Sequence, residues 1–296
     1  MNIHALRAFM EVAKENSLTK ASKHLSISQP AITMQIKKLE HELGLKLVGA
    51  NGRGVNLTEA GRFLFDNAKY LFKLEAKIED NLIDFRNQKK ESLRIASTYL
   101  PASYFLPRWL AEFKKKYSDV NINLYSNNSQ ETIKNLLSHN ADVAFVVKEK
   151  LASPELIMTH LFDVDFCFIV ASNNKYAGET VELKQLLKEP FLLREHGSST
   201  RELLLAICKQ NDLVMPNVGI QFHGLTESIQ TVIAGYGVML APSLMVNEYL
   251  QKGELSIIKV DGIEIKRPVY LCQRANDSNI STSMEYFINL IKGSIV

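Results

Sequence analysis

Polar and cationic side chains gather around residue 30, where a helix is predicted to begin. Gln29 can pair with an adenine edge, Thr33 can give its hydroxyl to a base or a phosphate, and Pro30 and Ala31 permit close approach. Neighbouring lysines would hold the phosphates, although the same lysines could instead form a solvated face. The residues that we predict to contact double-stranded DNA are Lys20, Ser28, Gln29, Pro30, Ala31, Thr33, Met34, Lys37, Lys38 and Arg53.

A second set of small polar residues stands directly after predicted strands, where helices begin. Helix starts offer unpaired N–H groups and a positive dipole end, so several together would form an anion-binding cleft. Arg194 could bind a carboxylate, sulfate or phosphate through two hydrogen bonds. Each residue alone is also explained as a helix cap, Ser199 with Glu202 as a capping box and Ser129 as an N-cap. The candidates are Ser97, Thr98, Asn128, Ser129, Arg194, His196, Ser198, Ser199, Thr200 and Thr226.

Enzymatic chemistry has no matching motif in this chain. The GYG stretch at 235–237 falls short of a dinucleotide-binding loop and follows a helix, and neither GxSxG nor a Walker A motif is present. The seven histidines show no metal-binding pairing, and the three cysteines lack the spacings of a metal site or redox pair. We therefore expect no enzyme activity, metal or cofactor, and three buried free thiols.

Length, composition and charge limit what must position these residues. A chain of 296 residues with 46% hydrophobic content predicts about two domains with substantial cores. Residues 1–90 carry 15 Lys/Arg and 10 Asp/Glu, whereas residues 91–296 carry 20 and 22. The basic front predicts a module that binds a polyanion. Apolar runs are only of strand length and the N-terminus lacks a signal-peptide pattern, so we expect no membrane contact and a cytoplasmic protein.

The first 58 residues are predicted to form a winged helix-turn-helix domain. Ser17 caps a short second helix that runs to about Leu25, and after a polar turn Gln29 opens a third helix that ends at Gly44. Two helices joined by so short a turn, the second with Pro in its first turn, are typical of a helix-turn-helix. The glycine-rich segment at 49–54 then predicts a hairpin, the wing.

Residues 59–90 are predicted to form one long helix that joins two copies of the chain. Its apolar residues are separated alternately by four and three positions, as in a helix that pairs with another helix, and only Glu75 interrupts them. The alternative is an ordinary amphipathic helix packed on its own domain. The dimerisation residues that we predict are Leu64, Ala68, Leu71, Ile78, Leu82 and Phe85.

From residue 91 the pattern changes to strands that alternate with helices, which predicts two doubly wound α/β units. Lobe I would comprise 91–161 and 268–296, and lobe II 162–267, with crossing segments near 161–165 and 264–268. A ligand would bind between the lobes, at the carboxyl ends of strands. The fold class is therefore an α+β multidomain chain whose C-terminal part is a two-lobed α/β domain of the periplasmic-binding-protein type.

Four segments together resemble the LysR-type transcriptional regulators over the whole length of the chain. They are ASKHLSISQPAITMQIKKLE at Ala21–Glu40, NLTEAG at Asn56–Gly61, FLLREHGSSTRE at Phe191–Glu202 and LTESIQTVIAGYGVMLAP at Leu225–Pro242. Met34-Gln35 and the REHGSSTR stretch are similar to the branch that regulates carbon fixation and sulfur assimilation. The chain departs from the family at its wing, where only Arg53 supplies an arginine, and at Met34, whose contact with DNA would be apolar.

The resemblance implies a regulator that binds promoter DNA and a small effector, here an anion. It implies that loops at 97–101, 127–130, 147–148, 196–200 and 224–226 line the effector cleft, which adds Val147 to the candidate residues. It also implies a dimer of dimers and contact with RNA polymerase. The alternative function is a solute-binding protein that uses the same cleft without regulating genes; it predicts a signal peptide and no basic module.

Overall fold

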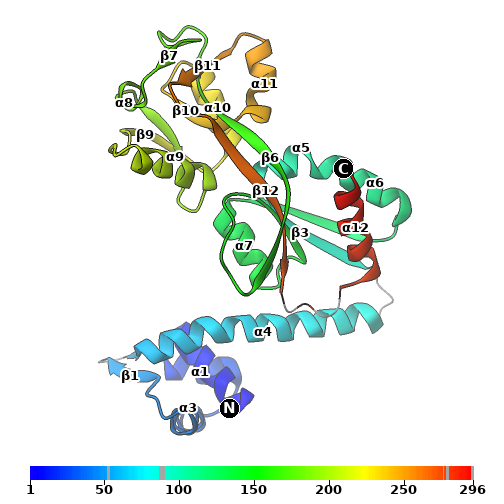
Figure 1. The fold of residues 1–296 in the computed structure, drawn as a ribbon. Coiled ribbons are helices and arrows are strands. Elements are labelled where there is room, and N and C mark those ends of the chain that lie inside the picture. The colour runs from blue at the N-terminus through cyan, green and yellow to red at the C-terminus, as the bar shows by residue number, and fades with distance from the viewer. Residues whose placement is uncertain (52–53, 87–90, 276, 278–279, 295–296) are drawn as a thin grey trace. The chain divides into compact units, whose positions relative to one another are not determined.

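The computed structural model describes residues 1–51, 54–86, 91–275, 277 and 280–294 (Figure 1). Contacts divide the chain into two compact units, Met1–Lys89 and Lys90–Val296. No helix in the described ranges is both long and apolar enough to cross a membrane. Two predicted residues fall outside this description: Arg53 as a whole, and the side chain of Phe85.

The first unit is a winged helix-turn-helix followed by a long helix, as the sequence predicts. Its elements are α1 (Ile3–Glu15), α2 (Leu18–Leu25), α3 (Gln29–Leu43), β1 (Val48–Asn51), β2 (Gly54–Leu57) and α4 (Glu59–Arg86). Ser17 and Ser28 cap α2 and α3 by accepting hydrogen bonds from the backbone N–H groups of Lys20 and Ala31, and Gly44 ends α3 with φ +65°.

The start of α4 packs very closely on the chain that leads into the wing. The Thr58 hydroxyl donates to the Lys46 carbonyl and accepts from the Gly61 N–H, while the Thr58 N–H donates to the Leu47 carbonyl. A Cβ at Gly61 would lie 2.1 Å from the Leu47 carbonyl oxygen. Glycine at this position therefore allows the wing and α4 to meet.

The apolar face of α4 is divided between two surroundings, and the pairing of two chains through it stays a prediction. Ala68 is buried and Leu64 is half-buried in the core of their own unit. Glu75 forms an ion pair with Arg7 of α1, which explains the polar residue in the apolar pattern. The exposed part of the seam begins later and consists of Leu71, Ile78 and Leu82, which are 41%, 52% and 62% exposed.

The second unit is built around one mixed sheet of strand order β4-β3-β5-β12-β6-β11-β7, with β10 also paired to β6. Strands β3, β4 and β5 are parallel, whereas β12 is antiparallel to both β5 and β6. A separate parallel pair, β8 and β9, completes the strands. The strands are β3 (Ser92–Thr98), β4 (Asn121–Asn127), β5 (Val143–Val147), β6 (Leu156–Ala171), β7 (Thr180–Val181), β8 (Phe191–Arg194), β9 (Val218–Phe222), β10 (Met239–Pro242), β11 (Leu255–Val260) and β12 (Ile265–Arg274).

The helices of this unit alternate with its strands, as predicted. They are α5 (Tyr99–Tyr104), α6 (Leu106–Lys116), α7 (Ser129–Leu137), α8 (Leu183–Leu186), α9 (Ser199–Gln210), α10 (Leu225–Ile233), α11 (Ser243–Gln251) and α12 (Thr282–Gly293). Phe105 separates α5 from α6, and α8 has only four residues.

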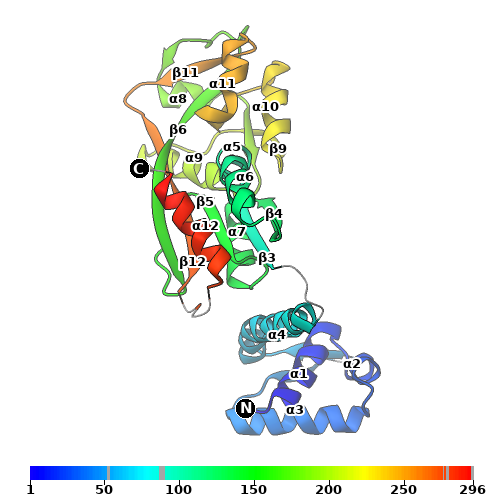
Figure 2. The same ribbon diagram turned by 90° about the vertical axis from the view of Figure 1, so that its right-hand side faces the viewer.

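Two long strands join the lobes, where the sequence suggested short crossing segments between separate sheets. We call β3–β5, α5–α7 and α12 lobe I, and β7–β11 with α8–α11 lobe II; β6 and β12 run side by side through both (Figures 1 and 2). The register of this pair shifts between Val269 and Tyr270. Strands β6 and β12 hydrogen-bond to each other from one lobe into the other, which satisfies their backbone groups. The two α/β units, which were predicted to be wound separately, therefore share one sheet.

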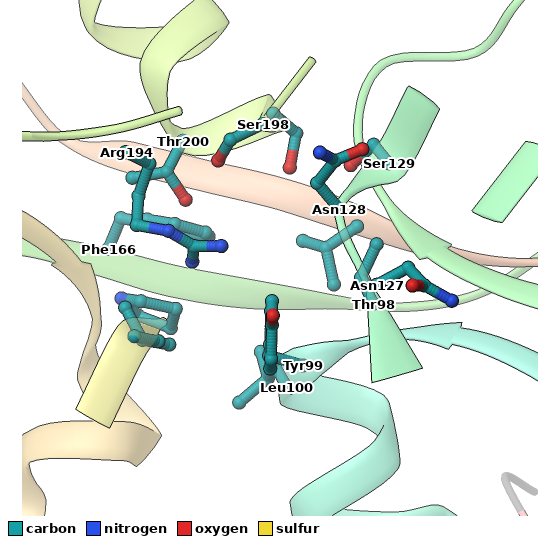
Figure 3. A pocket seen from close by; sticks show the side chains of 14 residues that line it. Thr98, Tyr99, Leu100, Asn127, Asn128, Ser129, Phe166, Arg194, Ser198 and Thr200 are labelled. Atoms are coloured by element: carbon teal, nitrogen blue, oxygen red, sulfur yellow. The ribbon is translucent and has the colours of Figure 1, made fainter. Parts of the chain in front are cut away.

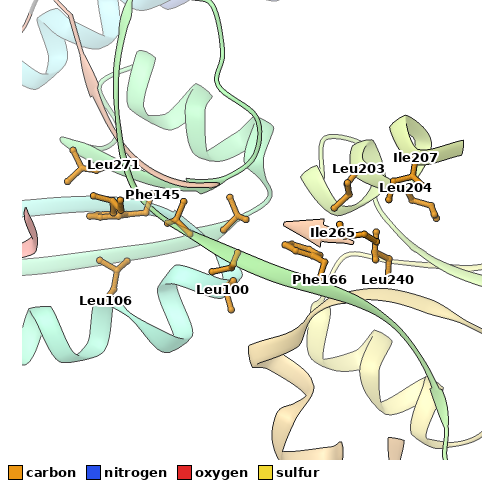
Figure 4. Packing of buried hydrophobic residues seen from close by; sticks show 14 of the residues in the cluster. Leu100, Leu106, Phe145, Phe166, Leu203, Leu204, Ile207, Leu240, Ile265 and Leu271 are labelled. Atoms are coloured by element: carbon orange, nitrogen blue, oxygen red, sulfur yellow. The ribbon is translucent and has the colours of Figure 1, made fainter. Parts of the chain in front are cut away.

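The main hydrophobic core also continues from one lobe into the other. Figure 4 shows Leu106 and Phe145 on one side and Leu203 and Leu240 on the other, with Phe166 of β6 between them. Phe166 is 7% exposed. A continuous apolar core therefore joins the two lobes.

Candidate functional site

Helix α3 separates an apolar face from the face predicted to contact DNA. Ile32, Ile36 and Leu39 are buried in the unit's core. The opposite face is exposed, with Met34 at 68%. A shallow hollow on that face is lined by Gln29, Pro30, Thr33, Met34 and Lys37.

Most of the residues predicted to contact DNA lie on or beside this exposed face. Lys20, Ser28, Lys37 and Lys38 are exposed, whereas Ala31 and Thr33 are half-buried. Gln29 Oε1 accepts a hydrogen bond of 3.2 Å from the Thr19 hydroxyl, which joins the start of α3 to α2. Contact with DNA stays a prediction for all of them, and Arg53 lies outside the described residues.

Thr33 has a second partner inside its own helix. Its hydroxyl donates to the Gln29 carbonyl at 3.0 Å, so a lone pair of Oγ1, rather than the proton, faces outward for a donor. The predicted role of Thr33 as a donor to a base therefore requires this bond to break.

A buried carboxylate, which no sequence motif marks, holds the base of the wing. Glu40 accepts hydrogen bonds from the backbone N–H groups of Leu47 at 2.8 Å and Val48 at 3.3 Å, and Lys46 lies 2.9 Å away. Burial alone would raise the pKa of this carboxyl. These hydrogen bonds outweigh burial, so the pKa of Glu40 lies below its ordinary value.

We expect Glu40→Gln to lower the free energy of unfolding of residues 1–89 by about 2 kcal/mol at pH 7, because it removes charge-assisted hydrogen bonds. The depressed pKa makes this stabilisation complete above the ordinary value of 4.5, and it is lost as the pH falls through the lower folded value. Calorimetric unfolding of the full chain between pH 3 and 8 measures both effects. Glu42→Gln, at an exposed position of the same helix, is the control. An equal loss at pH 7 for the two variants would contradict this role of Glu40.

Within the described ranges, one group of side chains has the types that bind metals. Ligand atoms of Glu11, Glu15 and His24 lie within 4.8 Å of one another. His24 Nδ1 is 2.8 Å from Glu11 Oε1 and 3.6 Å from Glu15 Oε1, so the imidazole joins α2 to α1. These contacts give the cluster a structural role within the helix-turn-helix.

The second unit has a small pocket between the lobes at the ends of several strands (Figure 3). Its volume is about 30 Å³, and Arg194 is the only ionisable side chain with a charge at neutral pH among its lining residues. Thr98, Asn128, Ser129 and Val147 line it from lobe I, as predicted. From lobe II the predicted lining residues are Arg194, Ser198, Ser199 and Thr200.

Three predicted effector residues lie elsewhere. Ser97 is buried and its hydroxyl donates to the Thr98 carbonyl at 2.9 Å, so it faces away from the cleft. His196 and Thr226 are exposed and do not line the pocket. The pocket instead includes Phe166 and Pro242, which come from the middle of β6 and the end of β10. Apolar residues inside strands carry no local pattern that marks them as pocket residues.

Neither of the two helix caps suggested by the sequence, Ser129 and the box of Ser199 with Glu202, is formed. Asn128 is the N-cap of α7, where its Oδ1 accepts from the Glu131 N–H at 2.9 Å. Ser129 therefore does not cap α7. The N-cap of α9 is Ser198, whose side chain makes no capping bond, and Glu202 lies 3.5 Å from Lys148 instead of forming a box with Ser199.

Two buried hydroxyl groups of α7 have no hydrogen-bond partner in the described part of the chain. They are Oγ of Ser129 and Oγ1 of Thr132, which are 1% and 0% exposed. Only Ser129 lines the pocket, on the wall opposite Arg194 (Figure 3). Because a buried hydroxyl without a partner is costly, Ser129 stays a candidate for a hydrogen bond to a ligand.

Arg194 is held in place by contacts on three sides. Its Nε and Nη2 donate to the Glu195 carboxylate at 2.9 and 3.0 Å, and Nη2 also donates to the His223 carbonyl at 2.8 Å. The guanidinium lies over the Tyr99 ring at 4.8 Å from its centroid. Nη1 has no hydrogen bond among the described residues. The predicted bidentate bond to a ligand is thus corrected: the fork is already used by Glu195, and Nη1 remains for a ligand.

The three cysteines are free, as predicted, but only two of them are buried. Burial raises the pKa of the Cys272 thiol to about 12, against the opposing charge of Lys148. Burial also raises the pKa of Cys208 and of the half-buried Cys167. A thiol that stays protonated at neutral pH is a poor nucleophile and metal ligand.

Comparison with protein families assigns both units. Residues 3–62 match the bacterial regulatory helix-turn-helix family of lysR type, and residues 86–294 match the LysR substrate binding domain. The chain is 27% identical over 270 residues to the HTH-type transcriptional activator CmpR of Synechocystis sp., covering 91% of this chain and 88% of that protein. It is 29% identical over 275 residues to the RuBisCO operon transcriptional regulator of Allochromatium vinosum, covering 93% and 90%.

Solved structures have the same fold. The crystal structure of CbnR, a LysR family transcriptional regulator, aligns over 100% of both chains with a TM-score of 0.63 and 21% identity. Full-length CbnR complexed with its target DNA gives 0.63 and 21% over 99% of this chain and 100% of that chain. The regulatory domain of CcmR from Synechocystis in complex with 2-PG gives 0.63 and 23% over 70% of this chain and 98% of that domain.

The family matches and the fold agree with each other and with the resemblance found in the sequence. A solute-binding protein without a DNA module does not account for residues 3–62, and the curated relatives are transcriptional regulators rather than enzymes. This chain belongs to the LysR family of bacterial transcriptional regulators.

Proposed function

We propose that this regulator binds promoter DNA through the exposed face of α3 and that a small anion, bound between the lobes, changes how it binds or activates. The observation that supports an anionic ligand is the set of residues that line the pocket. The pocket places Arg194 opposite Ser129, whose hydroxyl has no partner among the described residues, and the start of α7 (Figure 3), and no acidic side chain lines it. Guanidinium, hydroxyl and helix-start N–H groups are all hydrogen-bond donors that suit an anion.

Two solved structures support the two halves of this proposal. CbnR was crystallised with its target DNA, and the CcmR regulatory domain with 2-PG. We propose that the residues on α3 and the residues of the pocket have the corresponding roles in this chain, in the cytoplasm where promoter DNA is found. The dimer of dimers and the contact with RNA polymerase, which the family resemblance implies, are part of the same proposal.

A panel of small anions tests the effector. Carboxylates, phosphorylated sugars and sulfur oxyanions are added to the full chain, and the melting temperature of the second unit is followed, because a ligand that binds the native state raises it. The anion that raises it most is then added to a DNA-binding titration with a promoter fragment. A change in DNA affinity or in the length of DNA protected supports the proposal. If no anion changes either quantity, the anionic effector is wrong.

We further propose that a second copy of the chain covers the exposed seam of α4. Leu71, Ile78 and Leu82 repeat at coiled-coil spacing and are exposed in the single chain, where burial on a like helix would be favourable. A pair of modules on one duplex binds much more tightly than one module, because the second contact becomes intramolecular. Paired recognition helices would then contact half-sites about one helical turn, or a multiple, apart.

We expect the double variant Ile78→Asp with Leu82→Asp to be monomeric at micromolar concentration and to bind operator DNA roughly 100-fold more weakly. Multi-angle light scattering gives the mass, and a DNA titration gives the affinity. Phe63→Asp is the matched control, because Phe63 is 75% exposed on the same helix but lies off the seam. A double variant that retains the oligomeric mass of the wild type would show that the chains associate elsewhere.

A further inference from the structure

A short segment of lobe II supplies hydrogen-bond acceptors to the groups that an anionic effector would use. We call Glu195, His196 and Gly197 the acceptor segment. Its Glu195 carboxylate binds Arg194, and its Gly197 carbonyl accepts from the Gln130 N–H of α7 at 3.1 Å. The first contact neutralises the only cation of the pocket, and the second uses an N–H group at a helix start that borders the pocket.

The ion pair between Glu195 and Arg194 is shielded from water. The side chains are 6% and 4% exposed, and both carboxylate oxygens accept hydrogen bonds from the guanidinium. In so dry a place the charge of Glu195 acts strongly on anything nearby, because water screens it little. An anion that reaches Nη1 of Arg194 is therefore attracted by the guanidinium and repelled by the Glu195 carboxylate.

The contact between Gly197 and α7 crosses the cleft and requires glycine. The φ angle of Gly197 is +84°, and a Cβ there would lie 2.5 Å from Oε1 of Gln130. The lobes are also joined by Lys148 of lobe I, which lies 3.5 Å from Glu202 of lobe II. The segment thus reaches lobe I at the start of α7, where Asn128 and Ser129 line the pocket.

The small volume of the pocket is consistent with an acceptor segment that already occupies the donors a ligand would use. A cavity of about 30 Å³ has room for about two water molecules. An anion that takes the Gln130 N–H as a donor must displace the Gly197 carbonyl, either by separation of the lobes or by withdrawal of the acceptor segment.

We propose that the acceptor segment is an internal competitor of the effector, and that Glu195 determines which ligand charge the pocket accepts. The inference rests on the anionic effector proposed above. Because the attraction of Arg194 and the repulsion of Glu195 both grow in proportion to the ligand's charge, Glu195 cancels much of the preference for a dianion that Arg194 alone would create. Glu195 is in this sense a specificity-determining residue, which acts on the ligand without lining the pocket.

Sulfate and methanesulfonate, which differ in charge but little in size, test the proposal. Their dissociation constants are measured by calorimetry for the full-length wild type, Glu195→Gln and Glu195→Asp, with Ser129→Ala to assign the binding to the pocket. Glu195→Gln should tighten sulfate binding and shift the ratio of sulfate to methanesulfonate affinity toward sulfate by about tenfold or more. Glu195→Asp keeps the charge and should keep the wild-type ratio even if both affinities fall.

A structural role of Glu195 alone would weaken both anions together and leave the ratio unchanged, and that result would overturn the proposal while the anionic effector stands. Absence of binding by both anions to the wild type and to Glu195→Gln would overturn this inference, whereas the broader anion panel described above decides whether the effector is an anion.

A measurement on the wild type covers the case in which Glu195→Gln does not fold. The Ser198 N–H donates to the Glu195 carbonyl at 3.2 Å, a bond that depends on the folded acceptor segment. Saturating sulfate should speed hydrogen exchange at Ser198, although ligands usually slow exchange around their site. Slower exchange at Ser198 with sulfate would show that the segment supports the bound anion, contrary to the proposal.

Discussion

Replacement of Ser129 by alanine should leave the ligand-free protein as stable as the wild type or more stable, yet weaken anion binding about tenfold to hundredfold. The two effects have opposite signs because the hydroxyl has no partner until the ligand arrives. A buried unpaired hydroxyl costs about 1–3 kcal/mol, which alanine avoids. A hydrogen bond to a charged ligand contributes about 1.5–3 kcal/mol, which alanine loses.

Thr132→Val provides a matched control on the same helix. Thr132 is also buried with an unpartnered hydroxyl, but it does not line the pocket. Its replacement should raise or preserve the melting temperature without changing anion affinity. Thermal unfolding gives the melting temperature of each variant, and calorimetric titration gives its anion affinity. A Ser129→Ala protein that melts well below the wild type, or binds the anion equally well, would contradict the role assigned to Ser129.

Replacement of Lys37 and Lys38 by alanine should weaken binding to specific and random DNA alike, and Gln29→Ala should weaken binding to the operator alone. Each phosphate contact contributes about 0.9 to the slope of log affinity against log salt, so loss of both lysines should reduce that slope by about 2. A base contact by Gln29 carries about 1–3 kcal/mol of discrimination and no salt dependence. The two variants therefore separate backbone contacts from base reading on one helix.

These constants are measured from 50 to 300 mM salt with an operator fragment and a scrambled duplex. Lys184→Ala with Lys188→Ala is the control for net charge, because both lysines are exposed on the second unit, far from α3 in the chain. The control should retain the wild-type slope. If loss of Lys37 and Lys38 leaves the slope unchanged, these lysines form a solvated face and the DNA lies elsewhere.

The sequence predicted the helix-turn-helix well because local chemistry determines it. Ser17 and Ser28 each accept a backbone N–H of the turn that follows, and Gly44 takes the left-handed conformation that ends α3. Such interactions lie within three or four residues, so they do not depend on the rest of the fold. The apolar spacing of Ile32, Ile36 and Leu39 likewise fixed which face of α3 turns outward.

The sequence was less informative for α4, where one apolar stripe has two uses. The spacing of Leu64 and Ala68 continues into that of Ile78 and Leu82 without a break. Only the position of the helix-turn-helix core decides that the first pair is covered by its own unit and the second pair stays exposed. Periodicity identifies the buried side of a helix, but it does not identify what covers it.

The effector pocket was likewise predictable from the sequence only in part. The types and positions of Thr98, Ser129, Ser199 and Arg194 after strands were enough to predict a cleft rich in hydrogen-bond donors, because parallel strands bring their carboxyl ends to one edge. Only the tertiary structure decided that Glu195 already binds Arg194, that the Ser129 hydroxyl has no partner and that Ser97 faces away. These properties depend on atoms brought together from β3, α7 and β8, and the direction of a side chain there is set by packing across the cleft rather than by its neighbours in the sequence.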